Sequence, residues 1–174
     1  MDFIDLLKKR RSTRKFTEEK LTSVEVELLM KAALMAPTSK NSHSWEFILV
    51  DEQHILEPLA LCKPHGAAFV DKAPLVIVVA GDPTASDVWV EDASIAATAI
   101  QLQAESMKLG SCWAQVRSRM TASGDASESY IKELLEIPEH IAVLAIIAVG
   151  KKAEERKEFD ENKLLWEKLH LNRW

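Results

Sequence analysis

The chain has little cysteine. Its two thiols, Cys62 and Cys112, lie far apart in a sequence of 174 residues and form neither a CxxC motif nor zinc-ligand spacing. Two such residues make no disulfide framework, and their scarcity favours a reducing cytoplasm. The five histidines also lack the HxxxH or HxH spacing of a metal site. We therefore expect a cytoplasmic protein without a metal centre.

Long hydrophobic runs and nucleotide-binding glycine motifs are missing as well. The longest apolar run, near residues 141–149, is too short to span a bilayer. The acidic, periodic start of the chain does not resemble a signal peptide. No GxGxxG motif follows a predicted strand, so a Rossmann dinucleotide site is not indicated. These absences argue against a membrane protein and against a conventional dinucleotide-binding fold.

The chain does contain enough apolar sequence for one folded domain. Apolar residues make up 47% of it, which argues against disorder, and 174 residues can bury a sizeable core. The formal net charge is −5, so a nucleic-acid surface is not expected. We predict a single domain over residues 1–174, in which the composition changes after Gly150 to a charged C-terminal tail, 151–174.

Hydrophobic periodicity predicts alternating helices and strands. Helices are expected over residues 2–9, 23–35, 55–62, 67–72, 88–109 and 127–136, and strands over 45–50, 75–80, 111–116 and 141–149. Asp2 and Ser23 are suitable N-caps, and Gly110 is placed to end the long helix. In the tail, residues 160–170 carry an apolar stripe at helical spacing. Four strands together with a buried central helix predict a three-layer α/β sandwich.

The most informative segment is residues 10–16, Arg-Arg-Ser-Thr-Arg-Lys-Phe. Arg10, Arg11 and Arg14 place three permanent cations within five residues, and the guanidinium fork suits phosphate oxygens. On an acidic chain, such a dense basic spot indicates one local anion. The alternative is a solvated helix end, whose basic residues complement the helix dipole. This segment alone does not decide between the two.

Two further segments carry small polar groups. Residues 36–45, APTSKNSHSW, combine hydroxyl and amide side chains that hydrogen-bond polar ligand edges. An ordinary capped connection explains them equally well, because the same residue types form turns. Residues 109–113, LGSCW, contain Gly110, which permits close backbone approach. A helix stop followed by a strand is the alternative there.

Together these segments resemble the nitroreductase family of FMN-dependent NAD(P)H oxidoreductases. RRSTRKF is similar to the family's RRSxRxF phosphate motif, APTSKNSHSW to its APSxxNxQPW loop, and LGSCW to its GLGxCW segment. Gly150-Lys151 with the downstream Arg156 is similar to its C-terminal basic element. The match covers nearly the whole chain in the family's order and spacing. It departs at His43 and Ser44, where the family usually has Gln and Pro.

The resemblance implies a nitroreductase-like fold, with a central and mainly antiparallel sheet flanked by helices, and an FMN site. The phosphate and ribityl chain would be held by Arg10, Arg11, Ser12 and Arg14, and completed after Gly150 by Lys151 and Arg156. The flavin would be contacted from the other subunit by Pro37, Thr38, Ser39 and Asn41. Trp113, Ala114 and Gln115 would lie along the isoalloxazine ring. No residue is identified as a catalytic acid or nucleophile.

The tail bears on the oligomeric state. Its stripe of Leu164, Leu165, Trp166, Leu169 and Trp174 needs an apolar partner. It can pack on its own domain or reach across to a second copy. Family members place FMN at the dimer interface and embrace the partner with C-terminal segments, so the resemblance favours a homodimer with exchanged tails.

By resemblance, NAD(P)H transfers hydride to the flavin, and an oxidised acceptor then takes the electrons. The acceptor would be a nitroaromatic, a quinone or a similar electron-poor compound. One alternative is an FMN-binding storage or sensor protein with little turnover. A flavin-free phosphate-binding domain on the same scaffold is a further one.

Overall fold

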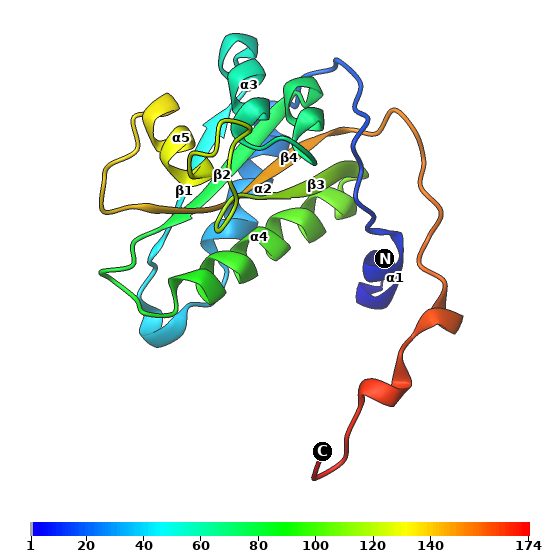
Figure 1. Cartoon of the computed structure of the whole chain (residues 1–174). Coiled ribbons are helices and arrows are strands. Elements are labelled where there is room, and N and C mark those ends of the chain that lie inside the picture. The colour runs from blue at the N-terminus through cyan, green and yellow to red at the C-terminus, as the bar shows by residue number, and fades with distance from the viewer. Residues whose placement is uncertain (1) are drawn as a thin grey trace.

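A single four-stranded sheet forms the centre of the computed structural model, which describes residues 2–174 (Figure 1). The strands are β1 (Trp45–Val50), β2 (Leu75–Gly81), β3 (Leu109–Gln115) and β4 (Ala142–Lys151). Their spatial order is β1-β2-β4-β3, and every neighbouring pair is antiparallel. The prediction of a mainly antiparallel central sheet is confirmed. Both β1 and β3 are edge strands.

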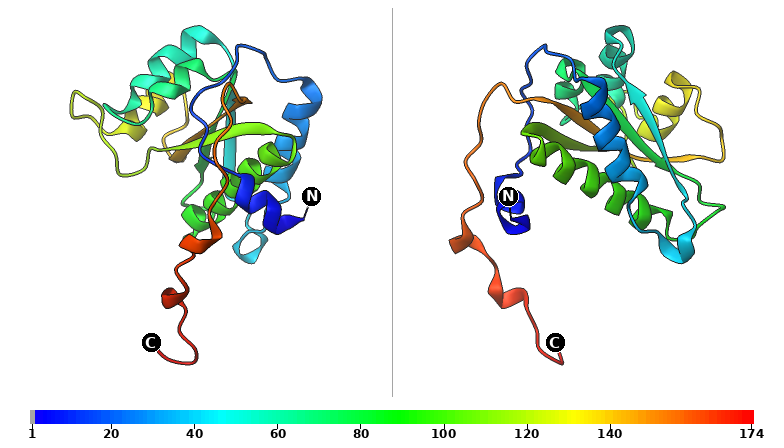
Figure 2. Two further views of the ribbon diagram at one scale, coloured as in Figure 1. Left: turned by 90° about the vertical axis from the view of Figure 1, so that its right-hand side faces the viewer. Right: turned by 180° about the vertical axis from the view of Figure 1, so that it is seen from behind.

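Helices cover both faces of this sheet. They are α2 (Ser23–Leu34), α3 (Gln53–Leu59), α4 (Trp89–Ser106) and α5 (Ser127–Leu134), whereas α1 (Phe3–Lys9) contributes no buried residue and lies against α4. One face packs against α2 and α4, and the other against α3 and α5 together with short 3-10 turns (Figure 2). The predicted three-layer sandwich is therefore confirmed. No helix in residues 2–174 is long and apolar enough to cross a membrane.

The core lies on both sides of the two central strands. Every residue of β2 is buried, and so is every residue of β4 between its two ends. This explains why both read as continuous apolar runs, since a strand covered on both faces has no polar side. The long helix α4 packs against them through Ala93, Ala97 and Ile100.

Several predicted element ends differ from the structure. The N-cap of α2 is Thr22 rather than Ser23, because Thr22 forms a reciprocal capping box with Glu25. The long helix ends at Ser106, and Lys108 takes the left-handed conformation with φ of 62°. Gly110 is thus not a helix-ending residue but the second residue of β3. The predicted helix over 55–62 begins at Gln53 and ends in a 3-10 turn, Ala60–Cys62.

The glycine in β3 is required by a close approach instead. A Cβ at Gly110 would lie 2.6 Å from Thr13 Cγ2 and 2.7 Å from Thr13 Cβ. Thr13 itself is 1% exposed. Gly110 therefore leaves the space that the Thr13 side chain fills. This agrees with the prediction that Gly110 permits a close approach to the backbone.

The helical spacing predicted for residues 160–170 of the tail does not correspond to an α-helix in the structure. The tail contains only two 3-10 turns, Glu161–Lys163 and Trp166–Lys168, and extends away from the sheet (Figure 1). Trp166 is 69% exposed and Trp174 is 99% exposed. These large apolar side chains contact no core within residues 2–174, so nothing in the chain itself stabilises a helix there.

Candidate functional site

The basic segment after α1 lies along the outer edge of the sheet. We call residues 10–16 the arginine arm. Ser12 forms a parallel bridge with Ser111 of β3, and the Thr13 N–H donates to the Ser111 carbonyl over 2.9 Å. Further along, Phe16 forms an antiparallel bridge with Lys152. The arm is therefore fixed at both ends to the sheet, from the start of β3 to the end of β4.

The arginine arm forms one side of a pocket of about 380 Å³. This arginine pocket is lined by Leu7, Arg10, Arg11, Ser12, Arg14, Arg156 and Phe159. It thus brings together five residues that the sequence predicts to hold a phosphate. Arg10, Arg11 and Arg14 form no ion pair within residues 2–174, and Arg156 has only Glu154 at 3.6 Å. Clustered guanidinium groups without acidic partners favour binding of an anion.

The start of the tail closes the other side of this pocket. The Phe159 N–H donates to the Lys8 carbonyl over 2.9 Å, and the Lys8 ammonium pairs with Glu161 at 2.9 Å. The hydrogen bond and charge of Glu161 raise the pKa of Lys8. These contacts join the tail to α1 and hold Arg156 against the arginine arm. Figure 2 shows the two segments running side by side.

The structure does not bring Lys151 into the arginine pocket. Its ammonium forms an ion pair with Glu19, whose hydrogen bond raises the pKa of Lys151. Gly150 lies beneath Pro74, because a Cβ there would be 2.5 Å from Pro74 Cδ. The adjacent Lys152 forms a buried ion pair of 2.8 Å with Glu105 at the end of α4. The end of β4 is thus held by Glu19, Pro74 and Glu105. Of the predicted basic element, only Arg156 lines the pocket.

The predicted ring-contacting residues lie on the free edge of β3. The Ser111 carbonyl points outward to the arginine arm, and backbone direction alternates along a strand. Trp113 and Gln115 therefore direct their N–H and C=O groups outward, whereas those of Ala114 face β4. The Trp113 indole N–H donates to Gln115 Oε1 over 3.0 Å, which links the two side chains. The outward groups of β3 are available to a flat polar ligand edge.

Cys112 lies in the same strand but faces the core. It is 1% exposed, and burial raises the pKa of its thiol, although the charge of Arg14 partly opposes this. A neutral buried thiol is a poor nucleophile. Cys112 therefore acts as a small apolar side chain behind the site.

The polar loop 36–44 lies far from the arginine pocket in the same chain. The loop contacts Asp92 in the first turn of α4, whereas Glu105 in the last turn of α4 contacts Lys152 beside the arginine arm. The 18 residues of α4 span about 27 Å at 1.5 Å per residue. Figure 1 shows the two segments at opposite ends of this helix. One chain alone does not bring Pro37, Thr38, Ser39 and Asn41 to its own arginine pocket.

Within this loop, internal hydrogen bonds engage some of the predicted residues. The Thr38 hydroxyl accepts from the His43 N–H over 3.2 Å, and the Ser39 N–H donates to Asp92 Oδ1 over 2.9 Å. Pro37 and Asn41 are exposed. Of the four predicted residues, Pro37 and Asn41 are therefore the ones most available to a ligand.

Asp92 is a residue that the sequence reading missed as part of the site. An acidic residue in the first turn of a helix complements the helix dipole, so its position alone does not mark it as functional. However, Asp92 falls four residues before the buried Ala96, on the apolar face of the helix. A carboxylate on a buried face is the signal that could have identified it.

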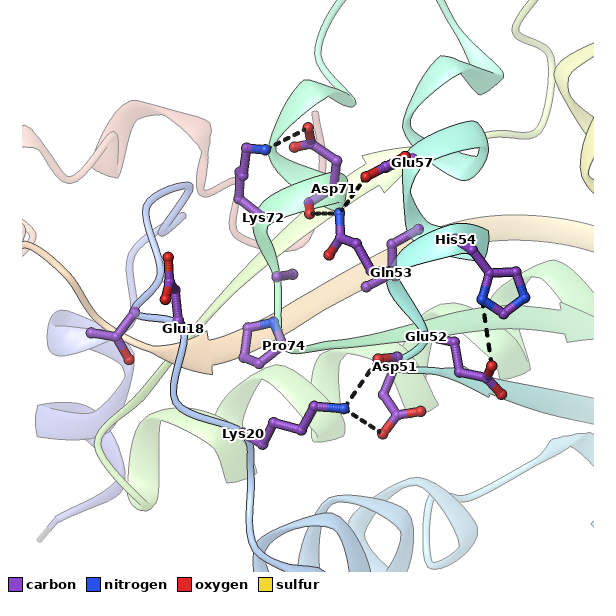
Figure 3. A pocket seen from close by; sticks show the side chains of 13 residues that line it. Glu18, Lys20, Asp51, Glu52, Gln53, His54, Glu57, Asp71, Lys72 and Pro74 are labelled. Atoms are coloured by element: carbon purple, nitrogen blue, oxygen red, sulfur yellow. Dashed lines mark hydrogen bonds and ion pairs between the residues drawn. The ribbon is translucent and has the colours of Figure 1, made fainter.

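The largest pocket lies elsewhere, between the start of α3 and the segment after the arginine arm (Figure 3). It measures about 780 Å³. Both of its lysines are already paired, with Lys20 at 3.6 Å from Asp51 and Lys72 at 3.2 Å from Asp71, and the carboxylates of Glu18, Glu52 and Glu57 add further negative charge. No predicted site residue lines it. In the described part of the chain, no group of three or more His, Cys, Asp or Glu residues is arranged to hold a metal ion.

Comparison with known proteins bears on the family and the fold. The family described as the nitroreductase family matches residues 7–151, a range that includes the arginine arm, the polar loop and β3. The solved structure of an FMN-dependent nitroreductase from Clostridium difficile R20291 is 43% identical and covers 99% of this chain and 100% of its own, with a TM-score of 0.95.

Two curated relatives are similar over most of the chain. A protein from Methanothermobacter thermautotrophicus, provisionally named NADH dehydrogenase/NAD(P)H nitroreductase, is 32% identical over 100% of this chain and 88% of its own. The FMN reductase (NADPH) of Bacillus subtilis is 28% identical over 86% of this chain and 66% of its own.

Proposed function

The chain belongs to the nitroreductase family, and on this premise we propose that it is an FMN-dependent oxidoreductase that passes hydride equivalents from NAD(P)H to an electron-poor acceptor. Nitroaromatic compounds and quinones are the proposed acceptor classes. The observation that carries this proposal is the arginine pocket, in which Arg10, Arg11 and Arg14 have no ion-pair partner within residues 2–174 and whose arginine arm is joined to β3 at Ser111.

The arginine pocket is the proposed phosphate end of the FMN site. Arg10, Arg11 and Arg14 supply fixed charge and forked N–H donors, and Ser12 adds a hydroxyl. Arg156 completes the set from the tail side of the pocket. Lys151 was expected in this set, but its pairing with Glu19 leaves it outside.

The free edge of β3 is the proposed contact for the flavin ring. When bound, FMN supplies the hydride-accepting ring. Trp113 and Gln115 direct backbone donors and acceptors towards its polar edge, and Ala114 contributes no outward backbone group. The described residues supply no acid or nucleophile at this edge, so the protein binds, orients and excludes water while the cofactor carries the chemistry.

A second copy of the chain is the proposed source of the remaining contacts. Pro37, Thr38, Ser39 and Asn41 lie at the far end of α4 and reach a flavin only from a partner subunit. We propose a homodimer with exchanged tails. The first part of the tail, 151–161, stays on its own chain through contacts of Ala153, Phe159 and Glu161, and the remainder of 151–174 packs on the other subunit. The exposed Leu165, Trp166 and Leu169 are suited to such a contact, since large apolar patches mark protein interfaces.

Visible absorbance of the purified protein tests the proposed activity. The protein is titrated with FMN, and then with NADPH or NADH under anaerobic conditions. We expect flavin bands that bleach on addition of the nicotinamide. Bands that persist would instead support the storage or sensor function, and absence of FMN binding would overturn the proposal.

Mixed dimers test the two-subunit site. Arg14→Ala and Asn41→Ala each impair a different half of the site. If the halves come from different subunits, a heterodimer of the two variants contains one wild-type site and one doubly altered site. We expect such heterodimers, isolated with two affinity tags, to bind FMN at half of their sites with wild-type affinity. Weak binding at both sites would show that both halves come from one chain.

A further inference from the structure

The carboxylate of Asp92 is buried without a cation. Asp92 is 3% exposed and forms no ion pair within residues 2–174. Burial of an ionised carboxylate is unfavourable unless hydrogen bonds and charges compensate it. The presence of a carboxylate therefore needs an explanation beyond packing.

Its hydrogen bonds provide that explanation. Asp92 Oδ1 accepts from the Ser39 N–H over 2.9 Å, and Oδ2 lies 3.3 Å from the Ser42 hydroxyl and 3.5 Å from the Ser86 hydroxyl. Two of these donors belong to the polar loop and one to the turn before α4. Asp92 thereby links the loop to the helix and to the preceding turn.

The loop is one that needs such support. Lys40, Asn41 and His43 have positive φ angles of 51°, 56° and 48°, which side chains with a Cβ rarely adopt. Such a run persists only where surrounding contacts over-determine the backbone. Asp92 contributes contacts on either side of Lys40 and Asn41, at Ser39 and Ser42.

Helix capping does not account for these contacts. A capping side chain accepts from the helix's own first N–H groups. Asp92 is the fourth residue of α4, the N-cap is Val88, and the hydrogen bonds of the carboxylate are made to other segments. Its neighbour Glu91 has the same charge in the same turn but is exposed.

We propose that Asp92 is a positioning residue, which holds residues 37–42 in the conformation that meets the flavin of the partner subunit's site. This inference rests on the proposed function. Asp92 itself touches no flavin in this arrangement. Its hydrogen bonds set the backbone that presents Pro37 and Asn41.

Flavin titrations of Asp92→Ala test the proposal, with Glu91→Ala as the matched control. Both variants remove one carboxylate from the same turn, but only Asp92 contacts the loop. We expect Asp92→Ala to weaken FMN binding about tenfold, the size expected when hydrogen bonds to a charged group are lost, and Glu91→Ala to leave it within about twofold.

Riboflavin distinguishes loop positioning from a general structural effect. Because the loop is proposed to meet the ring and the arginine pocket the phosphate, Asp92→Ala should weaken FMN and riboflavin by the same factor. Arg14→Ala should weaken FMN alone. Flavin-free Asp92→Ala should lose some thermal stability, because three hydrogen bonds to the carboxylate are removed, but it should stay folded at the temperature of the titration, so that the change in affinity is measured on folded protein.

Ser42→Ala keeps the proposal testable if Asp92→Ala does not fold. It removes one hydrogen bond to the carboxylate and leaves α4 intact. We expect a smaller loss of affinity for both flavins and a shifted absorbance maximum of the bound flavin. Unchanged affinity for both flavins in Asp92→Ala, or in Ser42→Ala where the former is unfolded, would overturn the inference. Failure of the wild type to bind FMN would instead overturn the proposed function.

Discussion

At the scale of single residues, Thr13 and Gly110 show how the arginine arm is kept in register. The buried Thr13 side chain occupies the space that the missing Cβ of Gly110 leaves. Its neighbours Ser12 and Arg14 are then directed away from β3 and line the arginine pocket. A glycine that the sequence suggested as a helix end therefore helps to set where the proposed phosphate-binding side chains point.

Gly110→Ala tests this register. The added methyl group overlaps Thr13, so we expect a loss of about 1–3 kcal/mol in the free energy of unfolding, the range for overpacking, together with weaker FMN binding. Urea unfolding and flavin titration measure the two effects. Combining it with Thr13→Gly restores the space, and part of the lost stability should return. Unchanged stability of Gly110→Ala would show that the arm does not depend on this contact.

Arg14→Ala tests the phosphate assignment. We expect the free energy of FMN binding to weaken by about 1.5–3 kcal/mol, the range for a hydrogen bond to a charged group. Lys15→Ala is the matched control, because Lys15 is the adjacent cation but pairs with Glu154 at 2.9 Å outside the pocket. Isothermal titration calorimetry gives both affinities. If FMN binds Arg14→Ala as tightly as it binds the wild type, Arg14 does not contact the phosphate.

At the scale of elements, the sequence predicts what burial determines and misses what local hydrogen bonds determine. The positions of β2 and β4 can be predicted from the sequence because a strand buried on both faces is a continuous apolar run. The N-cap of α2 was missed by one residue because Thr22 and Ser23 are both suitable caps, and only the bond with Glu25 decides between them. The tail was misread because its stripe has no partner within the chain.

The buried ion pair between Glu105 and Lys152 gives a prediction at this scale, since it joins the end of α4 to the segment after β4. Lys152→Met leaves the Glu105 charge buried and unpaired, and we expect a loss of about 3–5 kcal/mol of stability. Adding Glu105→Leu removes that charge and should recover most of the loss. Urea unfolding followed by tryptophan fluorescence measures both variants.

The exposed ion pair of Glu19 with Lys151 is the control for this comparison. Its carboxylate side is largely in solvent, so Glu19→Gln should change the free energy of unfolding by less than about 1 kcal/mol. A loss of equal size in Glu19→Gln and Lys152→Met would contradict the distinction between buried and exposed pairs.

At the scale of the whole molecule, the predicted site residues separate into two groups. Arg10, Arg11, Ser12, Arg14 and Arg156 gather in one pocket, whereas the polar loop lies at the opposite end of α4. The sequence named both groups through motif resemblance. It did not reveal that Glu19 holds Lys151 away, or that Asp92 supports the loop. Both depend on which side chains the fold brings together, and sequence spacing does not encode that.

Removal of residues 164–174 tests the proposed tail exchange. These residues carry the exposed apolar side chains but none that lines the arginine pocket. We expect the shortened chain to keep its fold by circular dichroism but to dissociate at protein concentrations where the full chain is dimeric. Sedimentation velocity measures the change. An unchanged dimer would show that the tail packs elsewhere.

The position of Arg156 has a consequence for how long each copy of the protein survives. The guanidinium group of Arg156 lines the arginine pocket. Arg156 belongs to the tail segment that Phe159 and Glu161 join to α1. On the proposed function, a phosphate group bound in this pocket would attract Arg156 towards the arginine arm, and the attached tail would then be less accessible to proteases. Without a bound anion, the positive charges of the arginines would repel one another, and the tail would be held less firmly. Cofactor supply would then set the turnover of the polypeptide, with unloaded copies degraded first and loaded copies retained.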